Sequence, residues 1–195
     1  MARLLYIKEI KDSHLLRLGI QEGEETSGYT VSSRLYSEIG SPMRRETLTD
    51  EQLVDIKRED EYVRAKKKAL SYLAFADNNE RTLRTKLIGK GFSREVSCDV
   101  AREMVTLGYI DERRQLERLV LTEANVKLAG KNKIVPKLMA KGYSSSDINT
   151  VIRELVDSGE IDFRANARRL IEKKLPADAD SEEKKKLLFK NGYRI

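Results

Sequence analysis

The sequence K-L-I-G-K-G-F-S occupies residues 86–93, and L-G-Y-I-D follows it at residues 107–111. Both patterns return 51 residues later, as K-L-M-A-K-G-Y-S at 137–144 and S-G-E-I-D at 158–162. A looser third copy, L-L-F-K-N-G-Y, lies at residues 187–193. Self-similarity at a fixed period is typical of tandem units that bury their apolar faces on one another. We therefore predict a repeat protein.

Each copy predicts helices that end at glycines. Gly91 and Gly142 follow a basic residue, as expected where a helix ends in a left-handed residue. Gly108 and Gly159 are expected to end the next helix in the same way. The residues expected to cap the following helices at their N-termini are Ser93, Ser144, Asp111 and Asp162.

Composition and repeats together predict a mainly α fold. Charged residues make up 36% of the 195-residue chain and aromatic residues only 6%, which suits an extended helical array with much surface. We expect residues 1–58 to form a small N-terminal antiparallel β meander plus a short helix. Residues 59–110 and 111–160 are then two three-helix repeats, and residues 161–195 a truncated third repeat.

Apolar spacing places the individual elements. In the N-terminal part, strand-like apolar residues fall in two groups, namely Leu16, Leu18 and Ile20, and then Tyr29, Val31 and Leu35. A short helix is expected from Thr49 and a separate, longer helix over residues 60–76. Inward-facing residues are expected at Val96, Val100, Met104 and Leu107 in the first repeat, and at Leu116, Leu119, Val120 and Val126 in the second. Pro136 is expected only within the first turn of its helix.

Basic residues are concentrated in the repeats. Residues 1–65 hold 10 Lys/Arg and 13 Asp/Glu, a net charge of −3. Residues 66–195 have a net charge of +9, so the whole chain carries +6. Such an excess is typical of a chain that meets a polyanion. The alternative for any one residue is an ordinary solvated surface charge.

The candidate binding residues are basic side chains that recur around the predicted helical hairpins. A stripe of them would suit a phosphate backbone or an acidic protein groove. Tyr109 and Tyr143, beside the turns, are expected to pack into the core rather than to stack on bases. The predicted basic stripe consists of Arg81, Arg84, Lys86, Lys90, Arg94, Lys127, Lys131, Lys133, Lys137, Lys141, Arg168, Arg169, Lys173, Lys174 and Lys190.

Catalytic chemistry finds little support in the sequence. His14, the only histidine, sits in a candidate strand turn, where we expect an exposed side chain rather than a member of a hydrolase triad. Cys98 is the only cysteine, and one Cys with one His cannot supply a zinc site. Gly130 and Lys131 lack the spacing of a phosphate-binding loop. We therefore predict no catalytic residue, no metal and no cofactor. The absence of a long apolar run and of a signal peptide favours the cytoplasm.

Four motifs in order resemble the RecX family of bacterial recombination regulators. They are E-D-E-Y-x-x-A-x-x-x-A-L-x-Y-L at residues 59–73, L-x-x-K-L-x-x-K-G-F at 83–92, G-Y-I-D-E at 108–112 and G-K-N-K-I-V-P-K-L-M-A-K-G at 130–142. Several modest motifs in the right order are more specific than any one of them alone.

The resemblance implies tandem three-helix units forming an elongated curved array. It also implies a partner, the filament of the RecA recombinase on single-stranded DNA, and inhibition of filament extension, ATPase, strand exchange and co-protease activity. The resemblance carries over no active site. We expect a monomer that binds single-stranded DNA with the filament, and other DNA non-specifically and more weakly. Two alternatives remain open: a helical-repeat nucleic-acid-binding module without a recombinase partner, and a scaffold for another protein.

Overall fold

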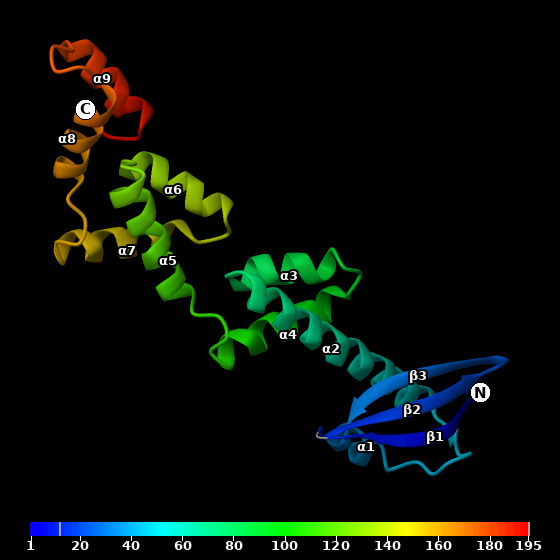
Figure 1. Cartoon of the computed structure of the whole chain (residues 1–195). Helices are drawn as coiled ribbons and strands as arrows, with labels where there is room; N and C mark the ends of the chain where they lie inside the picture. The colour runs from blue at the N-terminus through cyan, green and yellow to red at the C-terminus, as the bar shows by residue number, and fades with distance from the viewer. Residues whose placement is uncertain (12, 195) are drawn as a thin grey trace. The chain divides into compact units, whose positions relative to one another are not determined.

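The computed structural model describes residues 1–11 and 13–194. Asp12 and Ile195, which belong to the predicted N-terminal element and the predicted third repeat, lie outside the described residues. The described chain is mainly helical with an N-terminal antiparallel sheet, so the predicted fold class is confirmed (Figure 1). None of its helices combines the length and the apolar character needed to cross a membrane.

The chain divides into two compact units. Unit 1 comprises Met1–Ala76 and Leu83–Leu107, and unit 2 comprises Asp77–Thr82 and the chain from Gly108 onward. Residues 77–82, which lead into a helix of unit 1, therefore belong by their contacts to unit 2. The predicted boundaries at residues 58, 110 and 160 stay a prediction.

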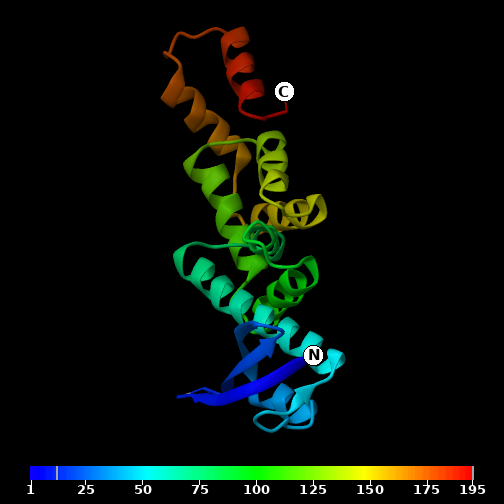
Figure 2. The same ribbon diagram turned by 90° about the vertical axis from the view of Figure 1, so that its right-hand side faces the viewer.

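Unit 1 begins with a four-stranded sheet in the order β3-β2-β1-β4. Its strands are β1 (Ala2–Ile10), β2 (Leu15–Glu22), β3 (Glu25–Ser32) and β4 (Thr47–Leu48). Figure 2 shows the sheet, in blue, beside the start of the following long helix, in cyan. Because side chains alternate across a strand, Leu18 and Ile20 lie on one buried face, where they pack with Ile56 from that helix. The predicted meander is confirmed, but Leu35 is not in a strand. It lies in helix α1 (Ser33–Glu38), whose N-cap Ser32 accepts a hydrogen bond from the backbone N of Leu35.

Helix α2 (Asp50–Phe75) is one continuous helix of 26 residues, so the prediction of two separate helices was wrong. Thr49 and Gln52 form a capping box at its start. The helix continues past residue 60 because Asp60 is buried and accepts the backbone N–H of Thr30 at 2.7 Å. Residues 57–60 also contain no glycine or proline that would end it.

Two further helices complete unit 1, α3 (Glu80–Ile88) and α4 (Arg94–Thr106). The second half of α2 lies beside α4 (Figure 1). Ala65 and Ala69 of α2 are fully buried. Three of the predicted core residues of α4 are buried, but Leu107 is 54% exposed. Leu107 is the C-cap of α4, where the helical periodicity that predicted its burial ends.

The regular elements that the structure describes in unit 2 are all helical. Its elements are α5 (Glu112–Leu121), the π-helical turn η1 (Thr122–Val126), α6 (Lys131–Ala140), α7 (Ser145–Asp157), α8 (Phe163–Lys174) and α9 (Ser181–Lys190). The main core joins Leu116, Val120, Ile134, Leu138 and Ile148. A smaller cluster joins Leu128, Leu170 and Tyr193.

Two predictions in unit 2 were wrong for local reasons. Val126 is 70% exposed, because η1 closes with a hydrogen bond from Lys127 N to Thr122 O that adds a residue to the turn and rotates Val126 outward. Pro136 lies inside α6, beyond its first turn. The carbonyl of Asn132 therefore receives no bond from position 136.

The turn predictions are confirmed. Gly91, Gly108, Gly142 and Gly159 all have positive φ, between 75° and 100°. Ser93, Ser144, Asp111 and Asp162 each accept a backbone N–H at the start of the following helix.

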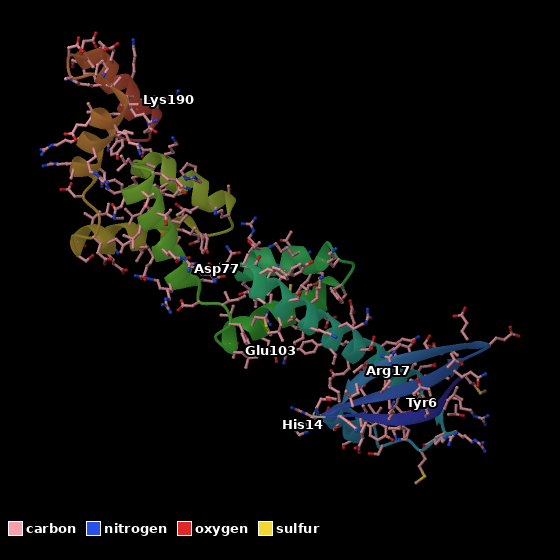
Figure 3. All side chains as sticks on the ribbon, viewed as in Figure 1. Tyr6, His14, Arg17, Asp77, Glu103 and Lys190 are labelled. Carbon is pink, nitrogen blue, oxygen red and sulfur yellow. The ribbon has the colours of Figure 1, made fainter. Side chains whose placement is uncertain are left out.

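The repetition extends to side-chain contacts. Tyr62 of α2 donates a hydrogen bond to Glu103 of α4 at 2.7 Å, and 51 residues later Arg113 of α5 pairs with Glu154 of α7. Each contact joins the first helix of a repeat to the third across 41 residues. Burial would raise the pKa of Glu103, but hydrogen bonds from Lys66 and Tyr62 outweigh it and lower that pKa. Glu103 is labelled on α4 in Figure 3.

Candidate functional site

The predicted basic stripe lies at the surface of both units. Fourteen of its fifteen residues are exposed and the remaining one, Arg84, is half-buried. Lys190 is labelled on α9 in Figure 3. Exposure is necessary for binding, but contacts within the chain separate the structural members of the stripe from the others.

Lys127 and Lys137 have a structural role. Both donate to Glu123 of η1 at 2.7 Å, and Glu123 is only 4% exposed. Burial would raise the pKa of this carboxyl, but the hydrogen bonds from the two lysines outweigh that effect and lower it. Glu123 was not among the residues predicted from the sequence, although its i,i+4 spacing to Lys127 was a readable signal.

Three more stripe residues have partners inside the fold. Lys133 donates to the side chain of Asn191 at 3.0 Å, and Arg169 donates to that of Asn166 at 3.3 Å. The Lys86 ammonium lies 5.6 Å from the centre of the Tyr72 ring. Lys90, by contrast, lies in a surface depression of unit 1.

That depression, which we call the cationic hollow, is lined by Arg64, Lys67, Lys68, Ser71, Lys90 and Phe92 and has a volume of about 400 Å³. A second depression of about 290 Å³ adjoins it and shares Arg64, Lys90 and Phe92. Its remaining lining residues are Tyr29, Lys57, Asp60, Glu61 and Gly91.

Helix α2 supplies one wall of the hollow. Residues 64, 67, 68 and 71 follow the i, i+3, i+4, i+7 spacing of a single helix face, while Ala65 and Ala69 face the core. The other wall is the turn after α3, with Lys90 and Phe92. The Arg64 guanidinium joins the two walls, because it lies 6.0 Å from the centre of the Phe92 ring.

The carboxylates near the hollow are engaged within the fold. Asp60 accepts from Thr30 N and pairs with Arg64 at 2.8 Å, and Glu61 accepts from Ser93 N at 2.5 Å. By contrast, Lys67, Lys68 and Lys90 form no ion pair with any residue that the structure describes. Lys68 lies instead 5.0 Å from the centre of the Tyr72 ring. The hollow therefore presents uncompensated positive charge beside an aromatic ring.

Three basic residues of the hollow do not belong to the predicted stripe. Arg64, Lys67 and Lys68 lie in the run R-A-K-K-K at residues 64–68, which we interpreted only as the start of a repeat. The helical spacing of these cations, combined with Lys90, was the available signal. The equivalent turn of unit 2 borders a depression of about 240 Å³ lined by both signs of charge, from Glu112, Arg113 and Asp147.

The two tyrosines beside the turns differ. Tyr143 packs against the core of unit 2 and its hydroxyl lies 3.2 Å from Gln115 Oε1, so its predicted packing is confirmed. Burial raises its pKa. Tyr109 is 57% exposed, so core packing was wrong for it, because it follows the Gly108 turn and points to solvent.

The residues considered for catalysis are dispersed. His14 is exposed in the turn between β1 and β2, as expected (Figure 3). Cys98 is partly buried on α4. Among the residues that the structure describes, no three His, Cys, Asp or Glu side chains lie together in a way that could hold a metal ion.

Fold and surface together define a class: a mainly helical protein of repeated helix groups with an exposed cationic surface. Its sequence is 30% identical over 143 residues to "Regulatory protein RecX" of Clostridioides difficile, and 30% identical over 135 residues to the protein of that name from Clostridium tetani. The chain belongs to the RecX family of regulatory proteins.

The matches differ in coverage. Those two alignments include 73% and 69% of this chain, but the chain spans only 65% and 60% of those relatives. A third relative, from Pelodictyon phaeoclathratiforme, is 26% identical over 63% of this chain and 76% of its own length. No model of a protein family matches the sequence.

Solved structures share the fold. A crystal structure of regulatory protein RecX superposes with a TM-score of 0.70 at 18% identity, covering 100% of this chain and 95% of the other. RecX from Lactobacillus salivarius gives a TM-score of 0.58 at 18% identity over 69% of this chain and 90% of that one. At 18% sequence identity, both matches show a shared fold.

Proposed function

We propose that this chain is a non-enzymatic regulator of the RecA recombinase that binds the recombinase filament on single-stranded DNA. The description of its relatives as regulatory proteins supports a regulatory role. Filament extension, ATPase, strand exchange and co-protease activity are the processes it would inhibit, with effects on DNA repair, recombination and the SOS response.

The observation that carries the proposal is the cationic hollow. Lys67, Lys68 and Lys90 have no acidic partner among the described side chains, so they are available to an external anion. A nucleoprotein filament offers both phosphates and acidic protein surface. Lysine is a point charge that suits phosphate contacts without base preference.

The proposal is tested by titrating the purified chain into the single-strand-stimulated ATPase of the host RecA. Inhibition at well below one chain per recombinase subunit, while the DNA remains unsaturated, is expected if the chain acts on the filament. DNA binding at the same salt is measured in parallel. Full DNA binding without any inhibition would contradict the proposal and favour the nucleic-acid-binding module.

A matched pair of variants assigns the effect to the hollow. The triple substitution Lys67→Gln, Lys68→Gln, Lys90→Gln removes three charges and is expected to raise the half-inhibitory concentration about tenfold or more, the loss of roughly 1.4 kcal/mol. The control Arg3→Gln, Lys8→Gln, Lys11→Gln removes three exposed charges from β1 and the turn that follows it in the same unit. Equal inhibition by both folded variants would show that the hollow is not the binding surface.

A further inference from the structure

The turn between the second and third helices of a repeat is a docking element within this chain. In unit 2, the turn after α6 contacts the start of α3: the Lys141 carbonyl accepts the Asn79 side-chain amide at 2.9 Å. The turn after α9 contacts the start of α6 in the same way. There the Asn191 carbonyl accepts Gly130 N at 2.8 Å, and the Gly192 carbonyl accepts Asn132 N at 3.0 Å.

These contacts share one chemistry. The first N–H groups of a helix have no partner within the helix, and the carbonyls of a tight turn accept from them or from the cap residue. The approach is close at both turns: a Cβ on Gly142 would meet the Asn79 side chain at 3.2 Å, and one on Gly192 would meet Lys133 N at 2.4 Å. The turn therefore recognises a helix N-terminus.

The first turn, at Lys90, Gly91 and Phe92, has the same conformation but no such contact. A Cβ on Gly91 would meet no atom within 4 Å, and Gly91 is exposed. The Lys90 carbonyl, which corresponds to that of Lys141, accepts no hydrogen bond from the residues that the structure describes. The two adjoining depressions lie at this turn.

The surroundings of the first turn match those of the second at an offset of 51. Glu112, which accepts the backbone N–H of Glu80 at the start of α3 at 2.7 Å, corresponds to Glu61. Gln115, which donates to the Asn78 carbonyl at 3.4 Å and lies beside Tyr143, corresponds to Arg64, which lies beside Phe92. Arg64 retains the capacity to donate to a carbonyl.

The charge of the ligand follows from the same correspondence. Arg118 of α5 forms an ion pair with Asp77, three residues before α3 begins. The residue 51 positions before Arg118 is Lys67, which has no acidic partner among the described residues. Lys67 is therefore placed to pair with an acid that lies just before an incoming helix.

We propose that the Lys90–Gly91–Phe92 turn and the cationic hollow dock the N-terminus of an α-helix of a partner protein, with an acidic residue about three positions before that helix. The Lys90 carbonyl and Oε2 of Glu61 accept its amide N–H groups, since Oε1 of Glu61 already accepts Ser93 N, and Lys67 pairs with the acid. The inference rests on the proposed function only in assigning that helix to the recombinase.

The probe is a helix-stabilised peptide that copies residues 76–90 of this chain and so carries Asp77 and the start of α3. Added to the isotope-labelled full chain, it is expected to shift the backbone amides of Gly91 and Phe92 with a dissociation constant of about 1 mM or tighter. The amides of Gly142 and Tyr143, whose turn is already docked, are expected to remain in place.

A charge exchange provides the decisive control. The peptide with Asp77→Lys is expected to lose binding to the wild-type chain, by about tenfold, and to regain it with the Lys67→Glu chain. No shift at Gly91, or equal binding of both peptides, overturns the docking site. Shifts at Gly91 caused by inorganic phosphate but not by the peptide would show a phosphate site instead, and shifts caused by raising the protein concentration alone would show a second copy.

The two proposals fail separately. Peptide binding without any effect of the chain on recombinase ATPase would leave the docking site standing and remove the proposed function. ATPase inhibition without peptide binding would do the reverse.

Discussion

At the scale of single residues, the structure separates charges that hold the fold from charges available to a ligand. Glu123, Lys127 and Lys137 form a buried carboxylate with two lysine partners. Lys67, Lys68 and Lys90 have no comparable acid among the described residues. Both sets look alike in sequence, because the partner of Lys137 lies 14 residues away and in a different element.

The pH dependence of stability tests the Glu123 cluster. The pKa of Glu123 is lowered in the folded chain, so its stabilising contribution is fully present above the ordinary carboxyl value of 4.5 and is lost as the pH falls from that value through the lowered pKa. Glu123→Gln should cost about 1–3 kcal/mol near pH 7. Urea unfolding at pH 7 and pH 4 should show the difference between wild type and variant shrinking at the lower pH. A constant difference would contradict the lowered pKa.

The close approach at Gly130 gives a second residue-scale prediction. Gly130 has a φ of −78°, so alanine fits the backbone, but its Cβ would lie 2.3 Å from the Gly192 carbonyl oxygen. Gly130→Ala should cost about 1–3 kcal/mol, as overpacking does. Hydrogen exchange should show lost protection at the Asn132 amide, which the Gly192 carbonyl accepts.

The control for that experiment is Gly159→Ala. Gly159 has a φ of 79°, but a Cβ added there would meet no atom within 4 Å, so its cost is backbone strain of about 1–2 kcal/mol. Asn132 should keep its protection in this variant. Loss of protection in both would mean that the effect at Gly130 is general destabilisation.

At the scale of elements, helix α2 links the sheet to the hollow. Its first half buries Ile56 against the strands, and its second half carries Arg64, Lys67 and Lys68. Because the helix is continuous, the cations are held in fixed order along one face. A helix interrupted near residue 60, as predicted from the sequence, would not fix them relative to the sheet.

Helix capping gives a prediction at this scale. Ser144 accepts the Asp147 backbone N–H at 3.1 Å at the start of α7. Ser144→Ala should therefore lower the free energy of unfolding by about 1 kcal/mol. Ser181→Ala, at the first helical residue of α9, is the control and should change it by less than about 0.5 kcal/mol in chemical denaturation. Equal losses would show that the Ser144 cap has no special role.

At the scale of the whole molecule, charge is distributed unevenly along the chain, with −3 over residues 1–65 and the basic excess beyond them. The hollow lies where these regions meet in sequence, since Arg64 and Lys67 border residue 65. Each of the two compact units carries part of the predicted stripe. Anion binding by the remaining stripe residues can therefore be tested by substituting those of one unit at a time in the full chain.

Salt dependence tests the whole-molecule charge. If Lys67, Lys68 and Lys90 each contact a phosphate, their replacement by Gln should reduce the slope of log K against log salt for single-stranded DNA by about 2. Fluorescence anisotropy at several salt concentrations measures the slope. An unchanged slope with unchanged affinity would place any DNA contact elsewhere, and would be compatible with docking of a protein helix at the hollow.

Most of the helices could be predicted from the sequence because their signals are local. Gly91 and Gly142 end helices by backbone conformation, and Ser93 and Ser144 begin them by short-range hydrogen bonds. Prediction failed where a distant contact decided, as for the continuity of α2, or where an irregular turn changed the period, as for Val126. The predicted stripe also included Lys90 but not Arg64, Lys67 and Lys68, the three basic α2 residues of the hollow.

The sequence by itself determined the period of 51 residues, the caps and turns, the mainly α class and the resemblance to the RecX family. These follow from patterns within about one helix or from repetition along the chain. Only the tertiary structure decided which lysines pair with buried Glu123, which line the hollow, and that the first turn lacks the helix start that the later turns contact. The physical reason is that charge compensation and docking depend on distances between segments far apart in sequence, and a repeated motif looks the same whether or not its neighbour is present.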